Sequence, residues 1–186
     1  MIGFAFCGSF CNFENAFLNL KALVSKGFDV LPIMSYNAYS TDTRFGKAED
    51  FIKRAERMCG HNVVHTLADA EPLGPKIKLD CLCICPCTGN TLAKLSCGVC
   101  DTPVTLAAKA HLRNDRPLVI ALASNDSLAG NAENFGRMLA RRNVYFVPLR
   151  QDDALTKPRS LVCEFSLLEK TIEKAMNGSQ IQPILI

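Results

Sequence analysis

Short runs of apolar residues alternate along the chain with segments whose apolar residues recur at helical spacing. Residues 2–7 are apolar without interruption, which is typical of a strand buried on both faces of a parallel sheet. Residues 13–24 then place apolar side chains along one helical stripe, and Gly27 follows as a helix stop. This alternation predicts a protein in which strands and helices follow one another.

The same rhythm continues to the C-terminus. We predict further strands over residues 30–34, 63–64, 81–85, 118–123 and 145–147. We predict further helices over residues 48–59, from 91 to at least 95, 102–112, 133–142, and from a cap at Ser160 to about residue 177. Residues 67–78 contain two prolines and a glycine and are predicted to be irregular.

Helices between successive strands imply right-handed crossovers and a parallel sheet covered on both faces. The predicted fold class is therefore α/β, with a single doubly wound, Rossmann-like domain whose mostly parallel sheet of about six strands is flanked by helices. We assign residues 1–178 to this domain and residues 179–186 to a C-terminal tail. Residues 180–186 are unusually apolar for a chain end, which predicts that the tail docks on a neighbouring subunit.

The length and composition exclude several classes of protein. A chain of 186 residues fits one domain with a well-filled core, and 48% hydrophobic with 21% charged residues is ordinary for a globular protein. The net charge of +3 is small and no run of Lys or Arg exceeds two residues, so we expect no nucleic-acid partner. No apolar run approaches the roughly 18 residues of a membrane span, and the N-terminus lacks the basic region of a signal peptide. We therefore expect a cytoplasmic protein with no membrane partner.

Ten cysteines require an explanation in a chain of this kind. Disulfide frameworks serve domains with small cores, and a metal site needs more than the single Cys-x-x-Cys formed by Cys97 and Cys100. Cys81, Cys83 and Cys85 alternate along a predicted strand, so their side chains share one face of the sheet. Between these alternatives the pattern favours reduced cysteines that pack as small hydrophobic residues, and we predict no metal site.

Ligands of doubly wound sheets bind outside the carboxyl ends of the strands, where the strand order reverses. The turns that leave those ends are polar or contain glycine, and they comprise Gly8–Ser9–Phe10, Ser35–Tyr36–Asn37, Pro86 to Thr91 and Ser124–Asn125–Asp126. The first turn lacks the G-x-G-x-x-G pattern of dinucleotide sites, and the chain has no Walker A loop. Gly8 and Ser9 in front of a helix suit a single phosphate, with a further hydrogen bond from Ser35. A mononucleotide fits these turns better than a dinucleotide.

The turn from Pro86 to Thr91 carries the most information. Pro86 is predicted to end the strand, and Gly89 permits the close approach of another group. Asn90 can both donate and accept hydrogen bonds, and Thr91 is predicted to cap the helix that follows. The donor–acceptor edge of a flavin ring needs fixed partners of this kind. An ordinary capped turn has the same residues, so the turn taken alone leaves both interpretations open.

The segment Pro-Cys-Thr-Gly-Asn-Thr-Leu-Ala-Lys-Leu from Pro86, followed by Gly98, Asp101 and Thr105, resembles the flavoprotein family that includes the homo-oligomeric flavin-containing cysteine decarboxylases. Those proteins carry a Pro-x-Ser-Ala-Asn-Thr turn, then a helix, then Gly-x-x-Asp-Asn. A Gly-Ser turn after the first strand and a Ser after the second belong to the same pattern, and the resemblance covers about the whole chain. It implies that FMN is the cofactor and that it is bound by Gly8, Ser9, Phe10, Ser35, Pro86, Thr88, Gly89, Asn90, Thr91, Asp101, Thr105 and Asn125.

Two departures set this chain apart from the decarboxylases. Their helix after the first strand carries a catalytic His, but residues 11–15 here read Cys-Asn-Phe-Glu-Asn; their Pro-x-Met-Asn segment is Leu-Ala-Ser-Asn at residues 122–125. Residues 69–76, 125–134 and 157–162 instead resemble a branch of the family that supplies one component of a two-subunit enzyme of spore-forming bacteria. That enzyme makes a pyridine dicarboxylate, the calcium chelator of endospores, in the mother cell.

This resemblance implies the oxidation of a dihydropyridine dicarboxylate to its aromatic form. A small dicarboxylate substrate needs cations, for which Lys157 and Arg159 are the candidates. It also needs a proton acceptor, for which Asp126 is the candidate and Glu133 the alternative. The implied partner subunit resembles an NAD(P)-dependent dehydrogenase and would carry NAD(P). The family also implies a homo-oligomer, either a trimer or a dodecamer. A stand-alone FMN-dependent decarboxylase and a non-catalytic structural partner protein remain the alternatives.

Overall fold

The computed structural model describes residues 1–186, and parallel strands β1 to β5 form its centre. Their order across the sheet is β2-β1-β3-β4-β5. All residues of β1, β2, β3 and β5 are buried, as continuous apolar runs require when helices cover both faces of a sheet. The strands span Ile2–Phe6 (β1), Val30–Met34 (β2), Cys81–Cys87 (β3), Leu118–Ser124 (β4) and Val144–Phe146 (β5).

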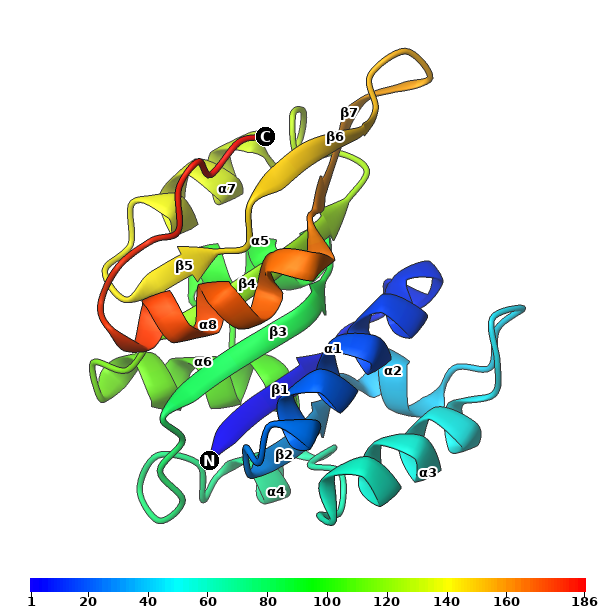
Figure 1. Cartoon of the computed structure of the whole chain (residues 1–186), viewed down its shortest axis with the longest axis vertical. Helices are drawn as coiled ribbons and strands as arrows, with labels where there is room; N and C mark the ends of the chain where they lie inside the picture. The colour runs from blue at the N-terminus through cyan, green and yellow to red at the C-terminus, as the bar shows by residue number, and fades with distance from the viewer.

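Helices cover the two faces of this sheet (Figure 1). Helices α1 (Phe13–Ser25) and α8 (Leu168–Met176) lie in front of the sheet in Figure 1, and α5 (Gly89–Cys97) and α6 (Pro103–Arg113) lie behind it. The remaining helical segments are η1 (Phe10–Asn12), α2 (Tyr36–Ser40), α3 (Ala48–Cys59), α4 (Leu67–Ala70), α7 (Ala132–Leu139) and η2 (Phe165–Leu167). The predicted doubly wound, Rossmann-like α/β domain with a mostly parallel sheet is therefore confirmed.

A hairpin completes the sheet and extends beyond the helices at the top of Figure 1. Its strands are β6 (Leu149–Asp153) and β7 (Lys157–Cys163). Strand β7 runs antiparallel to the last two residues of β4, whereas β5 pairs with the first half of β4. The sheet therefore has seven strands rather than about six.

The hairpin overturns the prediction of a loop and a helix cap over residues 157–160. Ser160 caps no helix; its hydroxyl donates to the Ser124 carbonyl at 3.2 Å, and α8 begins eight residues later at Leu168. Most side chains of residues 150–159 are exposed. The segment consequently lacks the apolar alternation by which a strand is recognised in a sequence.

Three smaller predictions also change. Residues 67–78 are not wholly irregular, because α4 forms a single turn held by a capping box between Thr66 and Asp69. Residues 63–64 form no strand, only one bridge from Val64 to Ile33. Strand β3 extends to Cys87, so Pro86 lies inside it, after a cis peptide bond, and does not end it.

A cluster of phenylalanine rings fixes the first helix against the first strand. The ring centroids of Phe6 in β1 and Phe17 in α1 lie 5.0 Å apart. Those of Phe13 and Phe51 of α3 lie 4.9 Å apart, in an edge-to-face pair. These rings are buried, and the burial of each contributes roughly 1.5–3 kcal/mol to stability. The cluster therefore holds the turn between β1 and α1 in place.

The cysteines are all free in this structure, and six of the ten are buried. Cys81, Cys83 and Cys85 contribute to the core from β3, as predicted. Burial raises the pKa of the Cys81 thiol to about 12 and that of the Cys83 thiol well above its ordinary value. These thiols therefore stay protonated and act as small apolar side chains.

The C-terminal tail packs along its own sheet. The Gln180 side-chain amide forms two hydrogen bonds with the Phe146 main chain. Its Oε1 accepts from Phe146 N–H at 2.8 Å, and its Nε2 donates to the Phe146 carbonyl at 2.7 Å. Leu149 N–H donates to the Ile184 carbonyl, and Ile186 N–H donates to the Leu149 carbonyl. The side chains of Leu185 and Ile186 remain 61% and 53% exposed, and docking of the tail on a neighbouring subunit stays a prediction. None of the helices has the length and hydrophobicity needed to cross a lipid bilayer.

One buried histidine predicts an acid-sensitive stability. His111, in the last turn of α6, is 4% exposed, and its Nε2 donates to the Pro117 carbonyl at 2.8 Å. Burial lowers the pKa of His111 from 6.5 to about 4, so the unfolded chain binds this proton more tightly than the folded one. The free energy of unfolding is therefore highest, as far as His111 is concerned, above about pH 6.5. It falls by about 3 kcal/mol as the pH falls toward 4.

The measurement is urea unfolding of the protein and of His111→Gln across this pH range. Because Gln keeps a hydrogen-bond donor and does not titrate, we expect its unfolding free energy to fall less steeply with acid. Parallel curves for the two proteins would contradict the assignment.

Candidate functional site

The strand order reverses between β1 and β3, since the chain leaves β1 toward β2 and enters the other half of the sheet through β3. Ligands of open α/β sheets bind in the crevice outside the carboxyl ends at such a point. Cys7 N–H donates to the Pro86 carbonyl at 3.2 Å, and Ser35 N–H donates to the Phe6 carbonyl at 2.9 Å. These two bonds bring together the ends of β1, β2 and β3. We call the residues that follow them the strand-end group, which comprises Gly8, Ser9, Phe10, Ser35, Thr88, Gly89, Asn90 and Thr91.

The first turn of this group is held by its own hydrogen bonds. Ser9 Oγ accepts from the Asn12 side chain at 2.9 Å, and Asn12 N–H donates to the Ser9 carbonyl at 3.0 Å. A Cβ added at Gly8 would make ordinary van der Waals contacts, at 3.6 Å, with Asn37 and the Phe10 ring. The Phe10 ring packs on Phe13 at 5.1 Å between ring centroids and is half-buried. The turn thus presents a backbone fixed by its own contacts.

Ser35 caps α2, and its Oγ accepts from Ala38 N–H at 3.3 Å. The residue is 9% exposed, and its hydroxyl proton has no acceptor within the chain. A buried hydroxyl with a free donor at the end of a strand suits a ligand oxygen.

Thr88 caps α5, in place of the predicted Thr91. Thr88 Oγ1 accepts from Thr91 N–H at 3.2 Å, and its hydroxyl donates to Thr91 Oγ1 at 3.1 Å. The main-chain N–H groups of Gly89 and Asn90 donate to no group of the chain, and the Asn90 side chain is exposed and forms no hydrogen bond. The start of α5 therefore offers free donors at the positive end of a helix.

A buried thiol lies beneath this turn. Burial raises the pKa of Cys7 to about 11, although hydrogen bonds with the Thr91 side chain and the Thr88 main chain oppose the rise. Cys7 thus lies at the end of β1 close to the start of α5. Its contribution could not be read from the sequence, where it is one of several apolar residues in a strand.

Asp126 stands at the predicted edge of the sheet, but its carboxylate is already engaged. Ser124 Oγ donates to Asp126 Oδ1 at 2.6 Å, and Asn131 Nδ2 lies 2.9 and 2.8 Å from the two carboxylate oxygens. These contacts hold the loop that follows β4. Asn131 was missed in the sequence because this loop has no periodicity, although its Asn, Asp and Ser residues are the kind that form side-chain-held loops.

Gly89 packs against this Asp126 network. A Cβ at Gly89 would lie 2.5 Å from Ser124 Oγ, 2.8 Å from Asn131 Nδ2 and 3.0 Å from Asp126 Oδ1. The groups that approach this glycine closely therefore include side chains of the chain itself. Asn125, beside the network, is exposed, and its side chain forms no hydrogen bond.

Asp101 and Thr105 are not brought to the strand-end group within the single chain. Both follow the far end of α5, which is about 13 Å long. Lys94 Nζ contacts both Asp101 carboxylate oxygens at 2.9 Å, and this bond lowers the pKa of Asp101. Thr105 is buried in the capping box with Thr102 that starts α6, as the predicted Thr102 cap requires. Their part in FMN binding stays a prediction.

Lys157 and Arg159 lie exposed on β7. Lys157 forms an ion pair with Asp152 at 2.6 Å, which raises its pKa. Arg159 forms no ion pair within the chain, and its carbonyl accepts from Leu128 N–H at 3.0 Å. The hairpin therefore runs beside the loop after β4, with the Arg159 charge unpaired.

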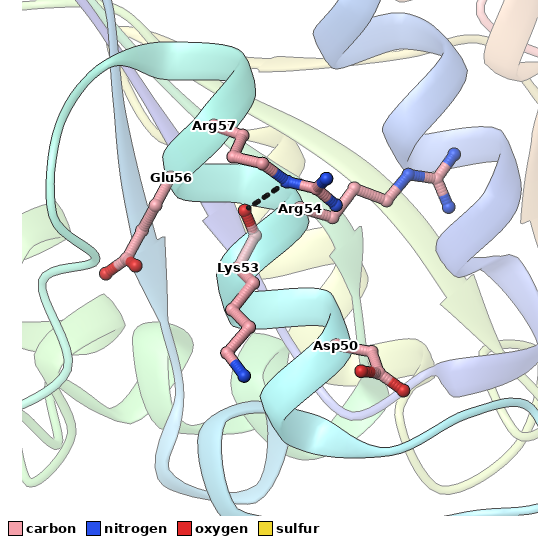
Figure 2. A pocket seen from close by; sticks show the side chains of 5 residues that line it. All are labelled: Asp50, Lys53, Arg54, Glu56 and Arg57. Carbon is pink, nitrogen blue, oxygen red and sulfur yellow. Dashed lines mark hydrogen bonds between the residues drawn. The ribbon is translucent and has the colours of Figure 1, made fainter.

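A hollow of about 570 Å³ lies on the charged outer face of α3 (Figure 2). No apolar residue lines it, and its charged side chains, of both signs, point outward. The one hydrogen bond drawn between these residues runs from Arg57 Nε to the Lys53 carbonyl, at 3.3 Å. Arg54 turns away from the others to pair with Glu14 at 2.6 Å. Because its polar groups do not converge, this face is a solvated surface rather than a ligand site.

Comparison with known proteins gives a consistent picture. Residues 2–174 match the family model described as Flavoprotein. The B subunit of dipicolinate synthase from Bacillus subtilis (strain 168) is 43% identical over 185 residues, which cover 100% of this chain and 92% of that protein. The crystal structure of the same subunit from Bacillus halodurans C superposes with a TM-score of 0.92 at 39% identity, covering 100% of this chain and 95% of that one. The FMN-dependent cysteine decarboxylase SpaF shares the fold, with a TM-score of 0.65, 21% identity and coverage of 94% and 95%.

The packing at Gly89 gives a direct test. We expect Gly89→Ala to lower the unfolding free energy by about 1–3 kcal/mol, because the new methyl group displaces Ser124 or Asn131 from Asp126. The matched control is Gly136→Ala in α7, where a Cβ meets nothing within 4 Å and alanine should be neutral or stabilising by up to about 1 kcal/mol. Urea unfolding compares the two variants. Equal stability of the two would show that α5 does not press on the Asp126 network.

Proposed function

Since this chain belongs to the Flavoprotein family, we propose that it binds FMN at the strand-end group. The observation that carries the proposal is the start of α5, where free N–H donors and the exposed Asn90 amide follow the end of β3, which is bonded to the end of β1. The strand order supports it, because flavodoxin-like sheets of the order 2-1-3-4-5 hold FMN at the crevice between their first and third strands.

The residues present fit the two ends of FMN. Gly8, Ser9 and Ser35 provide a glycine backbone, a hydroxyl and a buried hydroxyl with a free donor for the phosphate. Asn90 and the first N–H groups of α5 provide donors and an acceptor for the edge of the flavin ring. When bound, FMN supplies a ring that accepts a hydride.

We further propose that the chain is the flavoprotein component of a dipicolinate synthase. The support is 43% identity over the whole chain to a protein of that name. The substrate would be a dihydrodipicolinate-type ring, which loses a hydride and a proton to become the aromatic dicarboxylate. The partner would be the other component of dipicolinate synthase, its A subunit, an NAD(P)-dehydrogenase-like protein that carries NAD(P). We place the complex in the mother-cell cytoplasm of a spore-forming bacterium.

The tasks left to this chain are to hold two carboxylates and to receive a proton. Arg159 is better suited than Lys157 to bind a substrate carboxylate, because Lys157 is already paired with Asp152. Asp126 is the carboxylate at this edge of the sheet, and to accept a proton it must release a hydrogen bond from Ser124 or Asn131. The exposed ends of Leu185 and Ile186 support a homo-oligomer, which we propose is the trimer or dodecamer of the family.

FMN binding is tested by absorbance titration of the purified chain. We expect saturable binding, and we expect Asn90→Ala to weaken it about 3- to 10-fold through the loss of a hydrogen bond. Asn177→Ala is the control, because Asn177 is an exposed asparagine at the end of α8 whose amide bonds only the Glu173 carbonyl. A chain that binds no FMN at all would end the proposal.

The reaction is tested by dipicolinate formation with and without FMN and with and without the partner protein. We expect activity only when all components are present, and we expect Arg159→Gln to raise KM for the dicarboxylate about tenfold. Arg142→Gln, an exposed arginine beyond α7, should leave KM unchanged. Full activity without FMN would remove the flavin role, and release of CO₂ from a cysteine-containing peptide would favour a decarboxylase.

A further inference from the structure

A second cleft lies at the opposite end of α5 from the strand-end group. It is bounded by the loop between α5 and α6 and by the segment that follows α7, and its volume is about 160 Å³. Eight residues line it, namely Leu95, Gly98, Val99, Cys100, Thr105, Lys109, Leu112 and Arg141. No residue of the strand-end group lines this cleft, and the hydroxyl of Thr105, which does line it, is engaged with Thr102.

The wall of the cleft is apolar. Leu95 is buried and Leu112 is half-buried, whereas Val99 in the adjoining loop is 41% exposed. A volume of about 160 Å³ is well below the roughly 300–1,000 Å³ of sites for drug-sized molecules. The cleft therefore suits a ligand no larger than one small ring.

The charge of the cleft is entirely positive. Neither Lys109 nor Arg141 forms an ion pair in the chain, and no acidic residue lines the cleft. Asp101, the acid of the adjoining loop, is committed to Lys94. Two unpaired cations beside an apolar wall select a ligand that carries negative charge on an apolar body.

Arg141 is exposed and contacts the end of α5. One of its N–H groups donates to the Leu95 carbonyl at 3.4 Å, in the last turn of α5, and the others remain free. These free groups offer a planar fork that matches a carboxylate. Lys109 adds a second charge from α6, which suits a second carboxylate.

We propose that this cleft binds a small aromatic carboxylate, with the ring on Leu95, Val99 and Leu112 and the carboxylates on Arg141 and Lys109. The identity of the ligand rests on the proposed function, under which dipicolinate, the product, is the aromatic dicarboxylate at hand. The cleft is then a product-binding site distinct from the flavin site.

Calorimetric titration of the FMN-loaded chain with dipicolinate, and separately with benzoate, tests the proposal. We expect dipicolinate to bind more tightly than benzoate, since benzoate offers one carboxylate to two cations. Lys109→Gln and Arg141→Gln should each weaken dipicolinate binding about fivefold, as partly exposed ion pairs do. Arg142→Gln, the neighbour of Arg141 outside the cleft, should bind as the unchanged chain does.

Several results would overturn the proposal. Absence of dipicolinate binding, or binding that both cleft variants leave unchanged, removes the site. Loss of binding in Asn90→Ala alone would place dipicolinate at the strand-end group. A change of oligomer size in Lys109→Gln and Arg141→Gln, without a change in dipicolinate affinity, would assign the cleft to the C-terminal carboxylate of a second copy.

The tests of FMN binding and dipicolinate formation can fail independently of the tests of the cleft. A chain that binds no FMN, or that supports no dipicolinate formation, fails as the flavin-binding component whether or not the cleft binds benzoate and dipicolinate. Conversely, cleft variants that keep full FMN affinity and lose dipicolinate binding confirm the cleft independently of the flavin site.

Discussion

The hydrogen bond from Cys7 N–H to the Pro86 carbonyl is the interaction on which the rest of the site depends. It extends the pairing of β1 with β3 beyond the last paired residues, Ala5 and Ile84, to the point where both strands end. The bond from Ser35 N–H to the Phe6 carbonyl does the same between β1 and β2. Three polar turns, separated in sequence by up to about eighty residues, are thereby fixed within one crevice. Without this adjacency each would be an ordinary capped turn.

Packing behind the crevice makes it rigid from the other side. Gly89 lets the start of α5 press on Ser124, Asp126 and Asn131, so that the loop after β4 supports the turn after β3. A side chain at position 89 would displace these groups whether or not a cofactor is bound. The glycine of this turn therefore stabilises the fold as well as suiting a ligand, and its presence alone does not distinguish the two roles.

The sequence predicts most of the fold, because buried elements leave a periodic signal. Helix α3 has the bounds predicted for it, since its apolar residues follow a helical stripe and Gly60 ends it in a left-handed conformation. The hairpin β6–β7 was missed, because its outer residues are exposed and carry no alternation. For the site, strand ends could be located from the sequence, but the approach of Asn131 and Ser124 to Gly89 could not, because contacts between distant segments leave no local pattern. The engagement of Asp126 with Asn131 and of Lys157 with Asp152 is local, but it lies in a loop and an exposed hairpin that have no periodicity.

Helix α5 joins the strand-end group to the cleft at its other end, and its dipole explains why the two ends differ. The N-terminal end carries unsatisfied N–H groups and attracts negative charge. The C-terminal end is the negative end of the helix dipole and attracts cations, which is where Lys94 and Arg141 lie, the latter bound to the Leu95 carbonyl. Asp101 neutralises only Lys94, so Arg141 is left with charge to offer. An anion site at the far end of α5 is thus an indirect result of helix polarity: the helix attracts the cation, and the unpaired cation attracts the ligand.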